Sequence, residues 1–430
     1  MQKHHCHPPR SDEFFLSQEI KSGIKRRISL DPSERPQKAV DVSIKNVSES
    51  SLNGQHLRQF AAVAKRKKRT KKPKIPLSDK EVEEAWANIL NQTHFVQGGE
   101  LVQEVRKKVV MLGSDRSFEL LSSNATHIFG DGTFRFAPNH YKQMFTVHII
   151  KDNIYVPVAY FLLKNKQQRT YQIMFEMLRD KCPNFSPQTA HFDFEVAIHK
   201  AFHQVFPAAE VRGCRFHLAQ AWYRKLASLG LQVTYLIGKS KTAIWLKTCF
   251  GLPCLPCADV YEFFQAELTR ERPAIASLET FSNYLVNTYL APNSLFPPHL
   301  WAGCLNGDFL NTTNGCENFH RHFGIGCLNP HPSIYDWLVQ LQLTHKRNMI
   351  KSVGTNKPNK KSALLNAHLL GINQKFQSNE IDTMTFVKLA SLNCIPKSTR
   401  MVSTRSKSII SSIKKKYSIV VKRVLKTRKM

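Results

Sequence analysis

The sequence predicts an α/β protein built around a mixed β-sheet, and three observations lead to that fold class. Apolar segments of strand length, rich in β-branched and aromatic residues, recur from residue 126 to residue 217. From residue 169 onward they alternate with segments whose apolar residues repeat at helical spacing. The first three strand-like segments follow one another without an intervening helix, so antiparallel strands precede parallel ones in the chain.

Each core element has its own signal. The short polar turn Lys151-Asp152-Asn153 separates two long apolar segments and predicts a hairpin. The expected order is strands over 126–134, 143–150 and 154–163, a helix over 169–182, a strand over 189–195, a helix over 196–206, a strand over 210–217 and a helix over 218–229. Three antiparallel strands followed by parallel βα units describe the ribonuclease H-like α/β fold.

The remaining segments suggest six regions. SDKEVEEAWANIL has Ser78 as a plausible helix N-cap and acidic residues in its first turn. The expected regions are a basic, largely disordered leader over 1–75, a helical N-terminal region over 76–124, the first part of a ribonuclease H-like core over 125–229, a helical insertion over 230–305 before the last helix of the core, the last part of the core over 306–350, and a basic, flexible C-terminal tail over 351–430.

Composition limits the classes of function. The chain of 430 residues has 62 Lys and Arg against 32 Asp and Glu, a formal net charge of +30. Such a surplus favours a polyanionic partner, most commonly nucleic acid, although a basic but inert surface is the alternative. We find no apolar run near the roughly 20 residues of a membrane span and no apolar signal core at the N-terminus. Scattered cysteines suit a reducing compartment, so we expect a soluble protein of the nucleus or cytosol, and with a nucleic-acid partner we expect the nucleus.

Two clusters of basic residues are candidate phosphate contacts. The first precedes the sequence PKIPLS and could be a nuclear localisation signal, a phosphate-binding arm or a solvated linker. The second lies in a tail that has no acidic residue from Lys397 onward and could instead form a marginal helix. The candidate DNA-binding residues are Lys65, Arg66, Lys67, Lys68, Arg69, Lys71, Lys72, Lys414, Lys415 and Lys416.

Three acidic residues are candidate metal ligands. Asp131 lies inside the first predicted strand, where an unpaired buried carboxylate costs several kcal/mol, so it either decorates a turn or binds a cation. Asp193 follows the fourth strand, and in the predicted fold these two strands are neighbours. Glu317, on a later helix, would complete the site, although an exposed helix residue is the alternative. Carboxylates suit two Mg²⁺ or Mn²⁺ ions about 3.5 to 4 Å apart, the arrangement that promotes in-line phosphodiester chemistry.

The segment from Asp131 to His322 resembles the catalytic domain of Mutator-like element (MULE) transposases, a DDE family with a ribonuclease H-like core. The pieces that carry the resemblance are DGTFRFAPNHYKQMFTVHI, VPVAYFLLKNKQQRTYQIMFEML, DFEVAIHKAF, VFPAAEVRGCRFHLAQAWYRK and TTNGCENFHRHF, in the family's order. The resemblance places the three metal-binding acids on Asp131, Asp193 and Glu317. The chain departs from the family at Thr313, where a first of two asparagines is usual, and at Asn318, where glycine is common.

The family's Cys-x-x-His motif falls on Cys214 and His217. The resemblance implies that His217 lies close to the active site and contacts DNA or a scissile phosphate; a strand-end cysteine and a capping histidine are the alternative. Cys254 and Cys257 would complete a Cys₃His set for structural zinc if the two pairs met, but buried free thiols are the default expectation.

The N-terminus resembles the end of a FLYWCH-type zinc finger, which MULE proteins of animals often carry. The FLYWCH-type finger ends in His-x-His followed by prolines, and His5-Cys6-His7-Pro8-Pro9 matches that ending. Residues 4–9 could therefore be a remnant of the finger, or a chance match in a His-rich leader. Tetrahedral zinc needs four ligands, and this segment does not contain the cysteine pair that would precede them.

The expected function is that of a transposon-derived DDE transposase, which cleaves DNA at terminal inverted repeats and transfers the strand to target DNA; a homo-oligomer is one form it could take. A domesticated or inactive DNA-binding protein that retains the fold is the alternative, and a plain nuclease with the same site is a third option. Trp222, Trp245 and Trp301 could stack on an extruded base, or could simply pack in a core.

Overall fold

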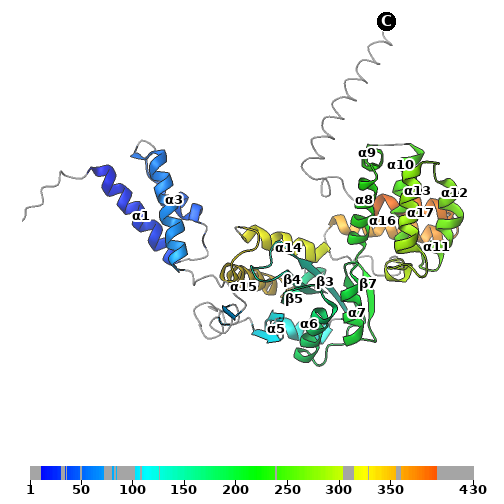
Figure 1. Ribbon diagram of the computed structural model, residues 1–430, viewed down its shortest axis with the longest axis horizontal. Helices are drawn as coiled ribbons and strands as arrows, with labels where there is room; N and C mark the ends of the chain where they lie inside the picture. Colours follow the sequence, from blue (N-terminus) through cyan, green and yellow to red (C-terminus); the bar gives the residue numbers. More distant parts are fainter. Residues whose placement is uncertain are drawn as a thin grey trace, which may run out of the picture.

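A computed structural model describes most of the chain, and Figure 1 shows how its elements are arranged. The described residues are 11–30, 34, 36–48, 51–71, 80–81, 84, 102–106, 109–124, 126–237, 240–303, 314–327, 329–354 and 360–394. Residues 4–9 and 395–430 therefore lie outside them, as do the zinc-finger match and the basic cluster of the tail. No helix in the described ranges is long and apolar enough to span a membrane.

A seven-stranded mixed sheet forms the centre of the protein, with strand order β1-β2-β5-β4-β3-β6-β7. Its strands are β1 Val102–Arg106, β2 Val109–Gly113, β3 His127–Thr133, β4 Gln143–Lys151, β5 Ile154–Leu163, β6 Thr189–Phe192 and β7 Glu210–Gly213. β3, β4 and β5 are antiparallel neighbours, whereas β6 and β7 continue the sheet in parallel from β3. The predicted mixed α/β sheet is confirmed, and this arrangement is compatible with a ribonuclease H-like fold.

The predicted hairpin joins β4 and β5. Its two connecting residues, Asp152 and Asn153, have φ values of 47° and 64°. Left-handed conformation at both central residues is the geometry of a type I′ turn, and Asp and Asn tolerate it better than most residues. The turn sets the register in which Lys151 pairs with Ile154.

Helices cover both faces of the sheet, which explains why its central strands are apolar on both sides. On one face α6 and α7 pack against Phe145, Val147 and Phe161. On the other face α14 and α15 pack against Met144 and Tyr160. The helices of these layers are α5 Asp115–Asn124, α6 Gln168–Lys181, α7 Val196–Val205, α14 Asn314–Gly326 and α15 Ile334–Lys351.

A second hydrophobic core is built from helices and the loops between them and includes the three tryptophans in question. Trp222 is completely buried, and the indole N–H groups of Trp245 and Trp301 donate to the carbonyls of Leu268 (2.7 Å) and Phe296 (2.9 Å). The three indoles therefore pack in this core. Its elements are α8 Arg215–Ser228, α9 Gln232–Ile237, α10 Lys241–Cys249, η2 Leu252–Cys254, α11 Asp259–Phe263, η3 Phe264–Leu268, α12 Thr269–Glu271, α13 Ala276–Leu285, η4 Val286–Leu290, η5 Pro298–Leu300, α16 Lys360–Gln377 and α17 Thr383–Cys394.

Two regional expectations are wrong in part. Residues 102–106 and 109–113, inside the expected helical region 76–124, form the antiparallel strands β1 and β2, which extend the sheet beyond β5. The β-branched residues of VVMLG are all buried on the sheet, so packing overrides the weak helical pattern. Residues 360–394, expected in a flexible tail, form α16 and α17, whose Phe386 and Val387 are fully buried in the helical core.

The leader is also more ordered than the expected largely disordered 1–75. It contains α1 Asp12–Leu30, α2 Pro36–Ile44 and α3 Gly54–Lys71, drawn side by side in blue in Figure 1. Ile20, Ile24 and Ile28 repeat at a spacing of four along α1 and pack against Phe60 and Ala64 of α3. The apolar repeat is short and diluted by charge, which hides the helix from a reading of composition alone.

Candidate active site

Asp131 lies within β3, opposite Thr146 of β4, and is only 7% exposed. The residue before it is a glycine for a steric reason. A Cβ atom at Gly130 would lie 2.6 Å from the Phe192 ring and 2.7 Å from the Phe145 ring. Those rings fill one face of the sheet, so β3 presents its carboxylate to the other face, where α14 lies.

His320 keeps the Asp131 carboxylate ionised in this buried position. Burial alone raises the pKa of Asp131, but the hydrogen bond from His320, the charge of His217 and the Gly132 backbone N–H together lower that pKa below its usual value. The Nδ1 atom of His320 lies 3.1 Å from Asp131 Oδ2. The buried acid that the sequence leaves unexplained is therefore paired with a histidine and a backbone donor.

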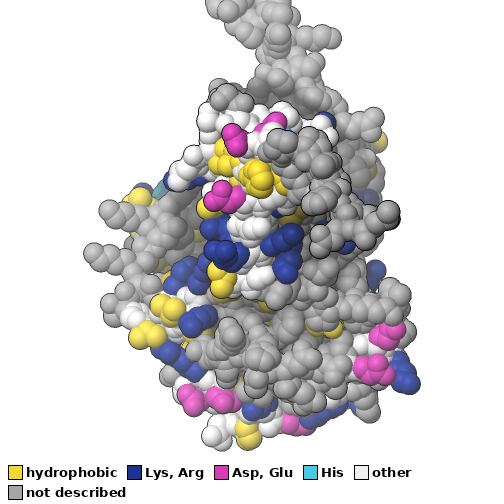
Figure 2. Space-filling model, turned by 90° about the vertical axis from the view of Figure 1, so that its left-hand side faces the viewer, with side chains coloured by type: hydrophobic (Ala, Val, Ile, Leu, Met, Phe, Trp, Pro, Cys, Tyr) yellow, Lys and Arg dark blue, Asp and Glu magenta, His cyan; other side chains and the backbone are white. Residues whose placement is uncertain are grey.

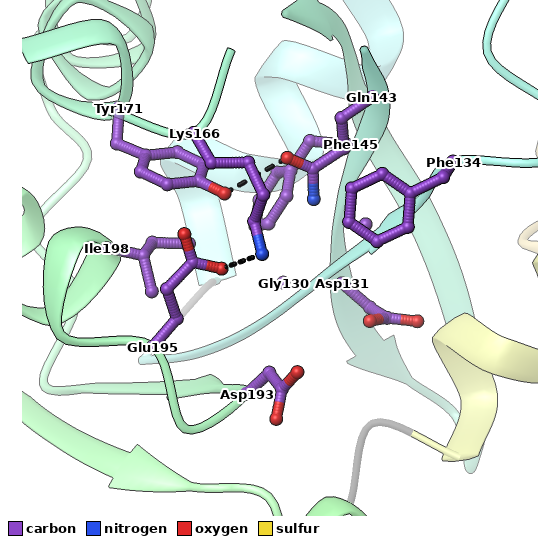
Figure 3. Close-up of a pocket in the computed structure, with 11 residues that line it drawn as sticks. Gly130, Asp131, Phe134, Gln143, Phe145, Lys166, Tyr171, Asp193, Glu195 and Ile198 are labelled. Atoms are coloured by element: carbon purple, nitrogen blue, oxygen red, sulfur yellow. Dashed lines mark hydrogen bonds and ion pairs between the residues drawn. The ribbon is translucent and has the colours of Figure 1, made fainter. Parts of the chain in front are cut away.

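Asp193 follows β6 and reaches the same edge of the sheet. β3 and β6 are parallel neighbours with Phe129 opposite His191, so positions 131 and 193 lie at the same level. The prediction that the strands of Asp131 and Asp193 are adjacent is confirmed. Figure 3 shows both carboxylates at one end of the sheet. The Asp193 side chain also accepts a hydrogen bond of 2.6 Å from the Phe194 N–H, which orients it.

Glu317 and His217 come from the first turns of α14 and α8. His217 Nε2 lies 3.1 Å from Glu317 Oε1, and its Nδ1 lies 3.8 Å from Asp193 Oδ1. The imidazole of His217 therefore stands between the two carboxylates. The His217 side chain is 14% exposed, and those of Glu317 and Asp193 are 31% and 52% exposed, so the group opens to solvent on the side of the acids.

The surroundings of His217 favour its protonated form. Burial lowers the pKa of the imidazole, but Cys214, Glu317 and Asp193 outweigh burial and raise it to about 12. His217 is consequently an imidazolium at neutral pH, flanked by acidic groups on both sides. The predicted Cys-x-x-His pair therefore brings a cation and a hydrogen-bond donor to the acidic cluster.

A chain of polar groups behind Asp131 has no counterpart among the predicted site residues. His320 Nε2 lies 2.9 Å from Thr146 Oγ1, which lies 3.0 Å from His148 Nε2. All three residues are at most 5% exposed. The one signal in the sequence was the spacing of Glu317 and His320, three residues apart on one helix, which places both on the same face of α14.

A small pocket adjoins the two aspartates. Its lining residues are Gly130, Asp131, Gly132, Phe134, Gln143, Phe145, Lys166, Tyr171, Asp193, Glu195 and Ile198. Figure 3 shows an ion pair between Lys166 and Glu195 and a hydrogen bond from the Tyr171 hydroxyl to Gln143 Oε1 along its wall. The Lys166 ammonium lies 5.2 Å from the centre of the Phe134 ring. The space beside the acids is thus bounded by paired polar groups and aromatic rings.

The acids suit a hard divalent cation by their chemistry, since Mg²⁺ and Mn²⁺ prefer carboxylate oxygens on rigid elements. As the side chains stand, no three His, Cys, Asp or Glu groups in the described ranges are close enough together to hold a metal ion. At this site the imidazole of His217 lies beside Glu317 and Asp193, two of the carboxylates that an ion would use. The Cys₃His set considered for zinc is not assembled either: Cys254 is buried in the helical core, and Cys257 is exposed.

The candidate phosphate contacts of the leader lie partly within the described residues. Lys65 and Arg66 are exposed on α3, and Lys67 is half-buried. The side chains of Lys68, Arg69 and Lys71, and the whole of Lys72, Lys414, Lys415 and Lys416, lie outside the described residues.

Comparisons with known proteins bear on the first half of this site. Residues 127–221 match the family model of the MULE transposase domain, a segment that includes Asp131, Asp193 and His217. A comparison with curated proteins gives no match. Among solved structures, a chain of the Drosophila P element transposase strand transfer complex aligns at 9% identity over 93% of this chain and 95% of that chain, with a TM-score of 0.23. That score is too low to establish a shared fold, whereas the family match shows that the chain carries a segment similar to a transposase domain.

Proposed function

We propose that this protein is a DDE-type transposase that cleaves DNA at the ends of a mobile element and joins the cut strand to target DNA in the nucleus. One observation carries the proposal. Asp193 and Glu317, from separate elements, flank the imidazole of His217, whose charge also acts on Asp131 at the same sheet edge. Two of these acids and the histidine lie in the segment similar to the MULE transposase domain.

Asp131, Asp193 and Glu317 would hold Mg²⁺ or Mn²⁺. Two such ions, when bound, activate the attacking oxygen and stabilise the leaving oxygen of a phosphodiester. The chain's own groups prepare the site for this chemistry: Asp131 remains ionised although it is buried, and Asp193 is oriented by a backbone N–H. The His217 imidazolium supplies a charged donor for a phosphate oxygen that enters between the acids.

DNA would be held through exposed basic side chains that are brought together by the leader helices. Lys21 Nζ lies 3.0 Å from Gln59 Oε1, and Glu13 lies 3.6 Å from His56, so α1 and α3 run in the same direction. Their C-terminal halves therefore lie toward the same end of the helix pair, and we name the exposed residues Lys25, Arg26, Lys65 and Arg66 in those halves the leader basic cluster. Lys and Arg side chains are prominent in the view from the side of α1–α3 (Figure 2), and such a surface favours phosphate binding.

The competing function is a DNA-binding protein without catalysis. Its fold would gain nothing from an ionised carboxylate at the position of Asp131, because burial of a charge opposes folding unless partners compensate for it. The presence of His320 opposite Asp131 thus supports the enzyme.

The test uses the full chain, labelled duplex DNA and Mn²⁺. We expect Asp131→Asn, Asp193→Asn and Glu317→Gln each to lower strand cleavage by roughly 100-fold or more, because each removes a charged metal ligand. Affinity for nonspecific DNA should change less than about twofold, since phosphate contacts dominate it. Asp152→Asn is the matched control, because Asp152 is exposed in the β4–β5 turn. Cleavage retained in any of the three variants would remove that residue from the site, and DNA binding by a wild-type chain that never cleaves would favour the competing function.

A further inference from the structure

The hydrogen bonds behind Asp131 can be assigned a direction, because a carboxylate only accepts. Asp131 Oδ2 faces Nδ1 of His320 at 3.1 Å, so Nδ1 must carry a proton. In a singly protonated ring the other nitrogen, Nε2, is then an acceptor. Its partner at 2.9 Å is the hydroxyl of Thr146, which must donate to it. The Thr146 hydroxyl has a single proton, and its other neighbour, the carbonyl oxygen of Asp131, is farther away at 3.4 Å.

The third member of the chain agrees with this direction. Thr146 Oγ1 donates to His320 and can therefore accept from His148 Nε2 at 3.0 Å. Burial lowers the pKa of His148 to about 3, so this ring is neutral and has one N–H. If that proton is on Nε2, His148 Nδ1 is a bare acceptor. Nδ1 is indeed buried without a hydrogen-bond partner in the described part of the chain, the less costly of the two ways to leave a ring nitrogen unpaired.

The arrangement links three elements of the site. His148 and Thr146 lie two residues apart on β4, so their side chains point to the same face of the sheet. His320 lies one turn after Glu317 on α14 and reaches Asp131 on β3. A shift of α14 against the sheet would therefore change the position of Glu317 and the hydrogen bond to Asp131 together.

We propose that His320 is a positioning residue for Asp131, held in its Nδ1–H tautomer by the directed chain from His148 Nε2–H through Thr146 Oγ1–H to His320 Nε2. The chain fixes one oxygen of the Asp131 carboxylate and the plane of the group, so that the remaining oxygen meets a divalent ion in a defined direction. The metal-directed part of this inference rests on the proposed function, whereas the tautomer does not.

The tautomer is tested in the full chain with ¹⁵N-labelled histidine at neutral pH. We expect the resonances removed by His320→Asn to be those of a ring protonated at Nδ1 with a bare Nε2 that accepts a hydrogen bond. A ring protonated at Nε2, or at both nitrogens, would overturn the chain. His322, exposed on the same helix, gives the matched control variant His322→Asn.

The positioning role is tested by Mn²⁺ affinity, measured by electron paramagnetic resonance without DNA, and then by cleavage. Loss of partners behind a metal ligand commonly lowers metal affinity by about 10- to 100-fold. We expect a loss in this range for Thr146→Val, which keeps the shape of the side chain but removes the donor, and recovery in Thr146→Ser, which restores the hydroxyl. Thr146→Ser also serves where the valine variant does not fold.

The outcomes separate this inference from the proposed function. Equal Mn²⁺ affinity in wild type, Thr146→Val and His320→Asn would overturn the positioning role while leaving the transposase proposal intact. A wild-type chain that neither binds Mn²⁺ nor cleaves DNA would overturn the proposed function, and with it the role of His320 toward a metal. A loss that Thr146→Ser does not restore would also count against the hydroxyl as the donor.

Discussion

His217 and Glu317, each in the first turn of its helix, meet at 3.1 Å between Nε2 and Oε1. This contact closes the acidic cluster on one side, since the other nitrogen of the same ring faces Asp193. The imidazolium therefore partly neutralises the acidic cluster, as a divalent ion would. A divalent ion that binds these carboxylates would have to compete with it.

Removal of that imidazolium should strengthen metal binding. In His217→Asn the repulsion between the ring and an incoming cation disappears, so we expect Mn²⁺ affinity to rise by roughly tenfold, equivalent to about 1.4 kcal/mol. Cleavage should fall, because the variant has no charged donor to phosphate at this position. Isothermal titration with Mn²⁺ measures the first effect, with His203→Asn on the exposed face of α7 as the control. Unchanged or weaker Mn²⁺ binding would exclude competition between His217 and the metal.

The distance between α14 and the sheet should be sensitive to one methyl group. A Cβ atom at Gly315 would lie 2.1 Å from the Tyr155 ring of β5. Gly315→Ala should therefore displace the start of α14, with Glu317, at a cost of about 1–3 kcal/mol in the free energy of unfolding. The cleavage rate should fall by more than the decrease in the fraction of folded protein accounts for. Gly371→Ala is the matched control, since nothing lies within 4 Å of its added Cβ, and it should be neutral or stabilise α16 by about 0.5–1 kcal/mol.

Acid should destabilise the core through its buried histidines. Burial, aided by the charges of His127 and Arg212, lowers the pKa of His191 to about 3 from an ordinary value of 6.5. The unfolded chain therefore takes up this proton first, and stability falls as the pH decreases from 6.5 toward 3, by about 1.4 kcal/mol per pH unit for this residue. Its Nε2 is also buried without a hydrogen-bond partner in the described ranges.

His191→Phe separates this effect from general acid sensitivity. The ring stacks on Phe129 with centroids 4.6 Å apart, and phenylalanine keeps that stacking while removing the titrating nitrogen. Urea unfolding should show little change or a small gain at pH 7.5 and a clear gain at pH 5. A gain that is the same at both pH values would mean that His191 does not titrate as described.

The leader basic cluster should control the salt dependence of DNA binding. Replacement of Lys25, Arg26, Lys65 and Arg66 by glutamine should weaken binding to all sequences alike and make the slope of log K against log[salt] shallower, by about 0.9 for each phosphate that the variant no longer neutralises. Fluorescence anisotropy at several salt concentrations measures that slope. Lys241→Gln with Lys375→Gln, exposed on the helical core, is the control, and an equal change there would assign the effect to net charge alone.

The sequence predicts the centre of this fold well because the central strands are long, apolar and bounded by turns. The β4–β5 hairpin follows from Asp152 and Asn153, and the pairing of β3 with β6 follows from the ribonuclease H-like topology that the order of elements indicates. The antiparallel strands β1 and β2 and the helices of the leader were missed because short apolar repeats among charged residues resemble weak helix or disorder. Their structure depends on partners distant in the chain.

The candidate site is predictable only in its parts. Asp131, Asp193, Glu317 and His217 can be singled out from motifs, but no motif tells that the ring of His217 lies between two of the acids. His320 was missed because its role depends on the distance between α14 and β3, which the packing of Gly315 and Phe319 on the sheet determines. In the sequence Thr146 and His148 look like ordinary strand residues. Only the folded structure shows that they are hydrogen-bonded to each other and to His320.

The chain leaves the sheet after β7, builds most of the helical core, returns for α14 and α15, and then adds α16 and α17 to the helical core. Neither core is thus encoded by one uninterrupted stretch. A premature stop after α15 would spare every acidic ligand candidate and still remove Phe386 and Val387 from the helical core. The product of such a shortened gene would therefore misfold although the motifs of its candidate site remained intact.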